Sequence, residues 1–260
     1  RLFLICMSVE EKHAYALLEA KIDDTLYLSE QRRAPCFTSF LALEEQAAAK
    51  GILKQAHFEN YLFYGGYEKS ERAVLGIFPK EQQYSSSFFP ITPLAFMYRQ
   101  AYNLSHRDFL GALMSCGIKR EALGDILTEP GRAVVFVKEE LSAYITAQIQ
   151  KVGNIGVSVS VLKNTDRLPP IKKPEEKFYT MASVRLDSVV SALTGLSRDK
   201  GAKLILAGNV FLNHQCRQNV SMHLKQGDTL SIRGYGKYII GDYTGLTKKG
   251  RVKLVIKQYR

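Results

Sequence analysis

The side chains of this sequence that could do chemistry are arginines and lysines spaced through its last third. They alternate with apolar residues and glycines, so that two expected short helices and a following hairpin would each carry cations. Cations presented from several elements can bind successive phosphates of one backbone, and helix N-termini add amide donors. The candidate phosphate contacts are Arg185, Arg198 and Lys203 on the helices and Arg217, Arg233 and Lys237 on the strands.

The positive charge of the chain is concentrated where these cations lie. Of a net charge of +11, residues 1–175 contribute little, with 21 Lys/Arg and 20 Asp/Glu, whereas residues 176–260 hold 15 Lys/Arg and 5 Asp/Glu. A general solubility bias would be spread along the chain, but a phosphate-binding surface is local. The distribution therefore favours a polyanion as the partner.

The sequence lacks the common motifs of catalysis and of metal binding. It has no Walker motif, no His-Glu-x-x-His and no Gly-x-Ser-x-Gly, and its histidines and cysteines have no ligand-like spacing. His106 and Asp108 could form an acid–base pair, although a capping or surface role is favoured. We therefore expect no catalytic residue, no metal and no cofactor.

Cysteine usage and hydropathy indicate the compartment. The four cysteines are scattered, which favours reduced thiols and a cytoplasmic protein. No apolar run approaches the roughly 20 residues of a membrane helix, so a membrane partner is not expected.

The elements that must position the cations follow two other segments. Residues 1–72 are expected to be helical, with helices over 9–22 and 41–52 separated by a break in which Thr38 could be an N-cap. Residues 73–168 show the order strand, helix, two strands, helix, strand of a ferredoxin-like, RRM-like domain. Its expected strands are 73–78, 91–98, 125–127, 133–137 and 157–162, and its helices are 106–115, capped by Ser105, and 139–151.

A proline-rich linker at 168–174 precedes the C-terminal domain, residues 176–260. The domain is expected to contain two short helices and a small antiparallel sheet, so the fold class of the chain is α+β. The first helix should end at Gly195, and the second should begin after Ser197 and end at Gly208. A strand at 210–213 and a hairpin over 229–237 follow.

The order of residues in this domain resembles the S4-type RNA-binding domain. The matching runs are Arg-Leu-Asp at 185–187, Ser-Arg at 197–198, Leu-Ile-x-x-Gly-x-Val-x-x-Asn at 204–213 and Gly-Asp-x-Leu-x-Ile-Arg-Gly-x-Gly-Lys at 227–237. The resemblance implies a role in RNA contact for Arg185, Arg198 and Arg233 in particular. One departure is Asn213-His214, where the family commonly has an Asn-Gly turn.

Two further runs extend the resemblance over the whole chain. With Tyr-Gly-Gly-Tyr-Glu at 64–68 and Gly-Ile-Lys-Arg-Glu-x-x-Gly-Asp-Ile at 117–126, the chain resembles the YlmH family of bacterial RNA-binding proteins.

A hairpin added after Gly241 could extend the basic surface. Strand alternation places Arg251, Lys253 and Lys257 on one face and apolar residues on the other. These cations could bind phosphate, or they could only protect a sheet edge from aggregation. The candidate RNA contacts of the hairpin are Lys248, Lys249, Arg251 and Lys253.

The sequence therefore predicts a noncatalytic protein that binds structured RNA. The resemblance implies ribosomal RNA or a ribosome-bound tRNA as the partner, on the large ribosomal subunit, with a task in the rescue or quality control of stalled subunits. Two alternatives stay open. Genes of the family lie near cell-division genes, which suggests a division-linked regulator or scaffold with division proteins as partners. S4-type domains also accompany pseudouridine synthases, although here the domain comes last and leaves little room for a catalytic domain.

Overall fold

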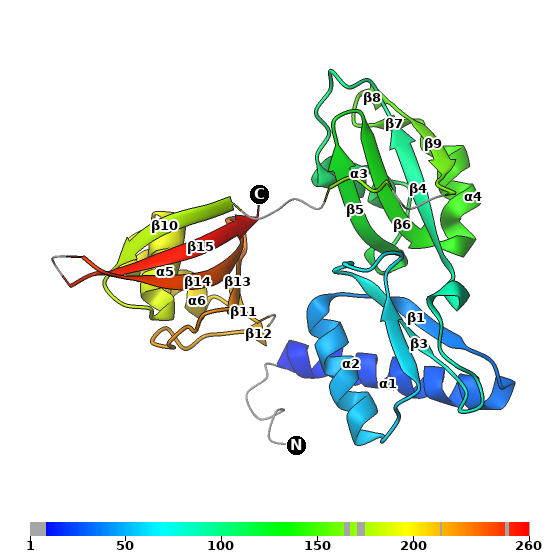
Figure 1. Ribbon diagram of the computed structural model, residues 1–260, viewed down its shortest axis with the longest axis horizontal. Coiled ribbons are helices and arrows are strands. Elements are labelled where there is room, and N and C mark those ends of the chain that lie inside the picture. Colours follow the sequence, from blue (N-terminus) through cyan, green and yellow to red (C-terminus); the bar gives the residue numbers. More distant parts are fainter. Residues whose placement is uncertain (1–8, 164–166, 171–174, 214, 248–249, 260) are drawn as a thin grey trace. The chain divides into compact units, whose positions relative to one another are not determined.

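The computed structural model describes residues 9–163, 167–170, 175–213, 215–247 and 250–259. The chain divides into two compact units, residues 1–170 and residues 171–260 (Figure 1). Both contain helices and antiparallel sheets, which confirms the predicted α+β class.

The first part of unit 1–170 is a three-stranded sheet covered by two helices. Its elements are α1 (Val9–Arg32), β1 (Cys36–Leu41), α2 (Leu43–Gln55), β2 (Tyr61–Tyr64) and β3 (Ala73–Ile77), with strand order β1-β3-β2. Leu18, Ile22 and Leu53 of the helices pack with Leu75 and Ile77 of β3.

This sheet departs from the helical segment expected for residues 1–72. Thr38 does not cap a helix: it lies in β1, and its hydroxyl accepts a hydrogen bond from the Leu75 N–H at 3.0 Å. A short apolar run such as Cys36–Leu41 has no periodicity that separates strand from helix. The segment 73–78, expected to open the central domain, is instead the middle strand of this first sheet.

The central domain has the ferredoxin-like arrangement. It contains β4 (Ile91–Met97), α3 (His106–Ser115), β5 (Leu123–Glu129), β6 (Arg132–Lys138), α4 (Glu139–Gln148) and β9 (Ser158–Val161), with strand order β5-β6-β4-β9. The small hairpin β7 (Lys151–Val152) and β8 (Ile155–Gly156) and the short 3-10 turns η2 (Ser86–Phe88) and η3 (Arg120–Ala122) complete it. Helices α3 and α4 cover one face of the sheet through Phe109, Leu113 and Ile145.

The other face of the central sheet packs against the first sheet. Val134 and Phe136 of β6 are buried in one cluster with Phe40 of β1 and with Val74 and Phe78 around β3. RRM domains use their open sheet face to stack RNA bases on aromatic side chains. In this chain that face is covered, so the central domain does not offer it to RNA while unit 1–170 stays folded.

The two family-like runs at 64–68 and 117–126 meet at the carboxylate of Asp125. That carboxylate accepts hydrogen bonds from the Tyr67 hydroxyl at 2.8 Å and from the N–H groups of Glu71 and Arg72 at 2.7 and 3.0 Å. Burial, and next to it the charge of Asp125, raises the pKa of Tyr67, so its hydroxyl stays protonated and donates.

The packing around Tyr67 demands a glycine beside it. Tyr67 stacks on Phe136 with ring centroids 5.0 Å apart. A Cβ atom at Gly66 would come within 2.2 Å of the Phe136 ring. The conspicuous motifs of the first 170 residues therefore hold the two sheets together.

Unit 171–260 is a six-stranded antiparallel sheet with two helices on one face. Its elements are β10 (Glu175–Met181), α5 (Leu186–Thr194), α6 (Arg198–Leu206), β11 (Val210–Leu212), β12 (Gln215–Cys216), β13 (Thr229–Ile232), β14 (Gly236–Leu246) and β15 (Val252–Tyr259), in the order β10-β15-β14-β13-β11-β12. Figure 1 shows α5 and α6 behind the strands β10, β15 and β14. Val189, Val190 and Ile205 of the helices pack on Ile240 and Leu254 of the sheet.

The local signals of this unit are confirmed. Gly195 takes φ +70° after α5, and the Ser197 hydroxyl accepts the Lys200 N–H at the start of α6. Asn213 adopts the positive φ of +49° that its turn requires; its neighbour His214 lies outside the described residues. Strand β10 was not expected, because it pairs with β15 more than 70 residues later and has no local turn signal.

We predict that Asp125→Ala loosens the contact between the two sheets of unit 1–170. Three donors would lose a charged acceptor, at a cost of at least about 2 kcal/mol. Amide hydrogen exchange of the full chain should then become faster in β3 and β5 but not in β13. The matched control, Asp24→Ala on the exposed surface of α1, should change little. Unchanged exchange in β3 and β5 would contradict this role of Asp125.

Candidate RNA-binding site

A single buried carboxylate joins two of the predicted arginines. Arg185 precedes α5, Asp187 lies in its first turn, and Arg198 opens α6. The Arg198 Nη2 atom lies 2.8 Å from Asp187 Oδ2, and the Arg185 Nε atom lies 3.3 Å from Asp187 Oδ1. The Asp187 side chain is 12% exposed, whereas those of Arg185 and Arg198 are 38% and 52% exposed. We call Arg185 and Arg198 the helix-side arginine pair.

The electrostatics of the pair keep Asp187 ionised. Burial alone would raise the pKa of Asp187, but the hydrogen bond and charge of Arg198, then the backbone N–H of Ser188 and the charge of Arg185, hold it below its ordinary value. Without this carboxylate, two guanidinium groups would face each other with like charge. With it, the cluster keeps a net positive charge and open N–H donors, which suits a phosphate.

The backbone amides at the start of α5 are not open to a ligand. The Leu186 N–H donates to the Met222 carbonyl at 2.8 Å, and the Asp187 N–H donates to the Val220 carbonyl at 3.0 Å. Phosphate binding at the start of α5 would therefore depend on the guanidinium groups, and not on the first amides of this helix.

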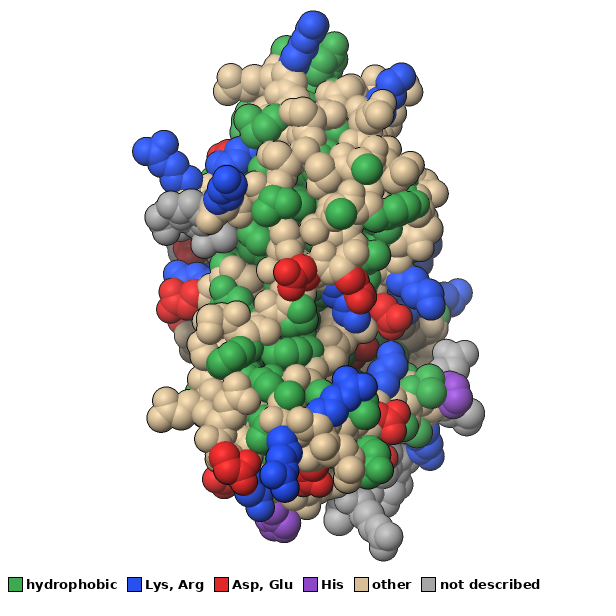
Figure 2. All heavy atoms as spheres, turned by 90° about the vertical axis from the view of Figure 1, so that its right-hand side faces the viewer, with side chains coloured by type: hydrophobic (Ala, Val, Ile, Leu, Met, Phe, Trp, Pro, Cys, Tyr) green, Lys and Arg blue, Asp and Glu red, His purple; other side chains and the backbone are tan. Residues whose placement is uncertain are grey.

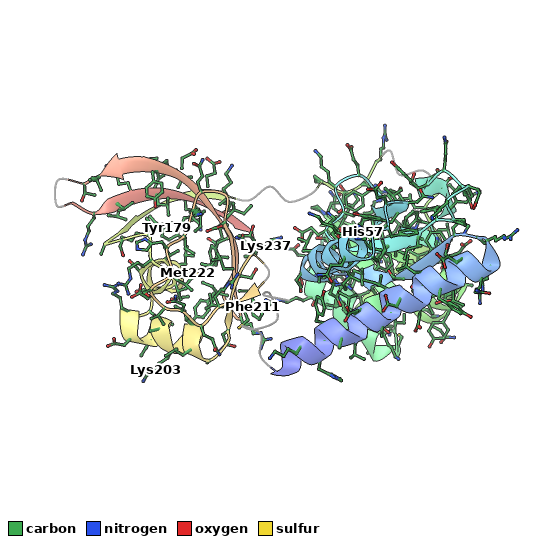
Figure 3. All side chains as sticks on the ribbon, turned by 90° about the horizontal axis from the view of Figure 1, so that it is seen from below. His57, Tyr179, Lys203, Phe211, Met222 and Lys237 are labelled. Atoms are coloured by element: carbon green, nitrogen blue, oxygen red, sulfur yellow. The ribbon has the colours of Figure 1, made fainter. Side chains whose placement is uncertain are left out.

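The remaining cations do not join this pair. Lys203 is exposed on α6, and Arg217 is half-buried in the loop after β12. The register places Phe211, Ser231 and Lys237 opposite one another on β11, β13 and β14. Their neighbours along each strand, including Leu230, Ile232 and Tyr238, are buried under the helices, so Lys237 lies on the opposite side of the sheet from α5 and α6. Figure 3 shows Lys203 at the helices and Lys237 and Phe211 on the strands.

Two other predicted contacts belong to this second side. The Arg233 guanidinium carbon lies 5.3 Å from the centre of the Phe211 ring. Lys253 is exposed on β15, on the face away from buried Leu254. Arg251 is exposed just before that strand, and Lys248 and Lys249 lie outside the described residues.

Phe178 and Phe211 are not among the contacts predicted from the sequence. Phe178 on β10 is 78% exposed, the most exposed large apolar side chain of the described residues. An alternating pattern in Glu175–Met181 could have indicated the strand, but its face depends on the pairing with β15.

Positive and negative charges are nearly balanced in the residues that form unit 1–170. On the face that Figure 2 displays, acidic and basic side chains are interspersed. This agrees with the near-equal counts of Lys/Arg and Asp/Glu in residues 1–175.

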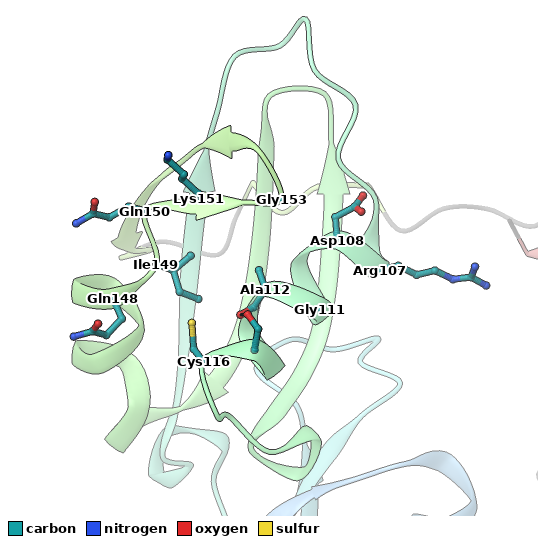
Figure 4. Close-up of a pocket in the computed structure, with 11 residues that line it drawn as sticks. Arg107, Asp108, Gly111, Ala112, Cys116, Gln148, Ile149, Gln150, Lys151 and Gly153 are labelled. Atoms are coloured by element: carbon teal, nitrogen blue, oxygen red, sulfur yellow. Dashed lines mark hydrogen bonds between the residues drawn. The ribbon is translucent and has the colours of Figure 1, made fainter.

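A groove of about 790 Å³ lies between α3 and the segment from α4 to the β7–β8 hairpin. In Figure 4, Arg107 and Gln148 extend away from it on opposite sides. Its carboxylate, Asp108, already accepts hydrogen bonds from the N–H and hydroxyl of Ser105, both at 2.7 Å. Asp108 therefore caps α3, and the groove gives no reason to assign catalysis.

In the described part of the chain, no three His, Cys, Asp or Glu side chains are grouped so that they could hold a metal ion. No helix there is both long and apolar enough to span a bilayer.

Comparison with known proteins finds both expected domains. The family model described as "Putative RNA-binding domain in YlmH" matches residues 79–166, and that of the S4 domain matches residues 184–230. The chain is 28% identical over 250 residues to "Ribosome-associated protein quality control protein P2" of Bacillus subtilis (strain 168), which covers 96% of both chains. The resemblance to the YlmH family and to the S4 domain is thus confirmed.

A solved structure supports the fold. "Cell division protein ylmH from Streptococcus pneumoniae" matches 62% of this chain and 96% of that chain, with a TM-score of 0.52 and 23% identity.

We predict that Asp187→Asn destabilises unit 171–260 by about 1–3 kcal/mol at neutral pH, because both arginines lose a charged acceptor. The folded-state pKa of Asp187 is lowered, so its contribution is present above the unfolded carboxyl pKa and is lost as the pH falls through the folded value. The stabilities of the variant and the unchanged protein should therefore begin to approach each other below about pH 4 and become equal once the pH is below the lowered folded-state pKa of Asp187. Urea unfolding at several pH values measures this, and the exposed Asp199→Asn is the control. A difference independent of pH would contradict the ionic role.

Proposed function

We propose that this chain, which carries an S4 domain and the domain found in YlmH, is a noncatalytic RNA-binding protein of the ribosome. The observation that carries the proposal is the helix-side arginine pair, held open by a buried carboxylate in the S4-matched segment of a basic unit. Guanidinium groups fixed in this way bind phosphate oxygens in a defined orientation.

The partner we propose is ribosomal RNA or a ribosome-bound tRNA on the large ribosomal subunit. This is supported by the relative from Bacillus subtilis, whose name describes a ribosome-associated quality control protein and which aligns along nearly the whole chain. The task would then be the rescue or quality control of stalled large subunits. A protein that holds RNA in place needs oriented cations and no reacting group, which agrees with the contacts described above.

Two alternatives remain to be tested against this proposal. The solved relative is named a cell division protein, which would suit a division-linked regulator or scaffold. At 23% identity, however, that likeness supports the fold alone. An RNA-modifying enzyme would need a carboxylate or another reacting group at an open site; Asp187 and Asp125 are both occupied by donors from their own unit.

We predict that Arg198→Ala and Arg233→Ala each weaken RNA binding by about 1 kcal/mol or more and reduce the salt dependence by roughly one ion. Binding to a structured RNA is measured by filter retention at several salt concentrations. The control is Lys80→Ala, an exposed lysine of the other unit. If both variants bind like the unchanged protein while remaining folded, this site assignment is wrong.

We also predict that the full chain co-sediments with large ribosomal subunits at low salt and is released at higher salt, because its phosphate contacts compete with counterions. A scaffold would instead retain a protein partner after nuclease treatment. An enzyme would change the nucleoside composition of its RNA, and it would lose that activity when one carboxylate residue is replaced. Crosslinking in cells, followed by sequencing of the attached RNA, identifies the site.

A further inference from the structure

The C-terminal sheet has a second face, away from the helix-side arginine pair that carries the function proposed above. The helices cover one face, and the register places Phe178 of β10, Lys253 and Lys257 of β15, Lys237 of β14 and Phe211 of β11 on the other. We call these five residues the outer sheet face. Strands β10, β14 and β15 all lie outside the segment 184–230 that the S4 model matches.

Phe178 is fixed in an exposed position by the strand register. It pairs with Val255, whereas the next residue, Tyr179, pairs with buried Leu254 and packs on the core. Phe178 cannot turn inward unless β10 shifts by one residue, which would expose Tyr179 and Met181. A phenylalanine that could gain about 1.5–3 kcal/mol by burial is thus held in solvent, with 78% of its surface open.

Lysines flank this ring on the neighbouring strand. Lys253 lies opposite Thr180 and Lys257 lies opposite Glu176, so both occupy positions diagonal to Phe178. Such diagonal neighbours are about 7–8 Å apart, within reach of aromatic and long side chains. The Lys257 Nζ atom lies 3.1 Å from the Glu176 carboxylate, an ion pair that also holds this lysine beside the ring.

A second aromatic ring lies across the same face. Phe211 on β11 has the Arg233 guanidinium 5.3 Å from its centre, and Lys237 is two strands away in the same register. Each end of the outer sheet face therefore combines an aromatic ring with cations.

The charge of this face favours a nucleic acid over a protein. Among the described strand residues that face outward outside the β14 bulge, Glu176 is the only acidic residue. Its charge is neutralised by Lys257. Asp242, in the bulge of β14, is engaged by the Gln226 amide. Lysine is depleted from the cores of protein interfaces, whereas aromatic rings among cations are typical of surfaces on which unpaired bases stack. Edge protection explains the lysines, but it does not explain an exposed phenylalanine between them.

We infer that the outer sheet face binds unpaired nucleotides of RNA, with Phe178 stacking on a base and Lys253 contacting a flanking phosphate. This inference rests on the RNA-binding function proposed above and adds a second surface to it. The helix-side arginine pair would contact folded RNA, and the outer sheet face would bind a single-stranded segment that extends from the folded part of the same RNA.

The test compares two RNA probes on the full chain: a stable hairpin with blunt ends, and the same hairpin with a short single-stranded extension. The unchanged protein should bind the extended hairpin more tightly. Phe178→Ala should lose this preference by about five- to a hundredfold and keep its affinity for the blunt hairpin. Phe178→Tyr, which retains the ring, should keep the preference. Lys253→Ala should reduce the salt dependence of binding to the extended hairpin.

The matched control is Tyr243→Ala, which removes an exposed aromatic residue that pairs with Leu254 on the other side of the sheet. If Phe178→Ala binds both probes like the unchanged protein, or if Tyr243→Ala loses the preference equally, the inference is overturned. A change in oligomeric state with Phe178→Ala and no change in RNA binding would assign the face to a protein partner instead.

The same experiment separates the two proposals. If Arg198→Ala weakens binding to both probes and Phe178→Ala weakens neither, the proposed function stands and this inference fails. If the unchanged protein binds neither probe nor ribosomal particles, the proposed function itself fails.

Discussion

The ion pairing of Asp187 with Arg185 and Arg198 is the interaction on which the helix pair of the C-terminal unit depends. It places one negative charge between two positive ones at the junction of α5 and α6. Because Asp187 is nearly buried, its charge would be costly without these partners. Because each arginine keeps a large exposed fraction, the donors not used by Asp187 stay open. The same contact thus stabilises the helix pair and orients the cations that could bind phosphate.

A second carboxylate has the corresponding role in unit 1–170, but its effect is structural. Asp125, on β5 of the central sheet, accepts hydrogen bonds from the Tyr67 hydroxyl and from two backbone N–H groups between β2 and β3. The first sheet is thereby held over the face that an RRM domain would present to RNA. The sheet face of the central domain is therefore not open to RNA. For the RNA-binding function proposed above, the contacts are expected from the basic unit, residues 176–260.

The C-terminal unit presents cations on two sides, and the cause is strand alternation. On β10, β11, β13 and β15, and on β14 up to Ile240, every second residue packs under α5 and α6, and the residues between face away from the helices. Lysines and arginines on these strands are therefore separated from the helix-side arginine pair. A surface with guanidinium groups on one side and aromatic rings between lysines on the other suits an RNA with both folded and unpaired parts.

The sequence by itself determined the α+β class, the ferredoxin-like order of the central elements, the helix caps of the S4-like segment and the concentration of charge near the C-terminus. These depend on composition, short-range periodicity and local capping, all of which can be seen along the chain. Tertiary structure alone decided that β3 joins β1 and β2, that Asp125 binds the segment around Tyr67, and that β10 pairs with β15. Tertiary structure also decided which cations come together. Asp187 forms ion pairs with Arg185 and Arg198, while strand register places Lys237 and Lys253 on the opposite face of the sheet. Each of these outcomes depends on pairing between distant residues, and no local pattern in the chain encodes it.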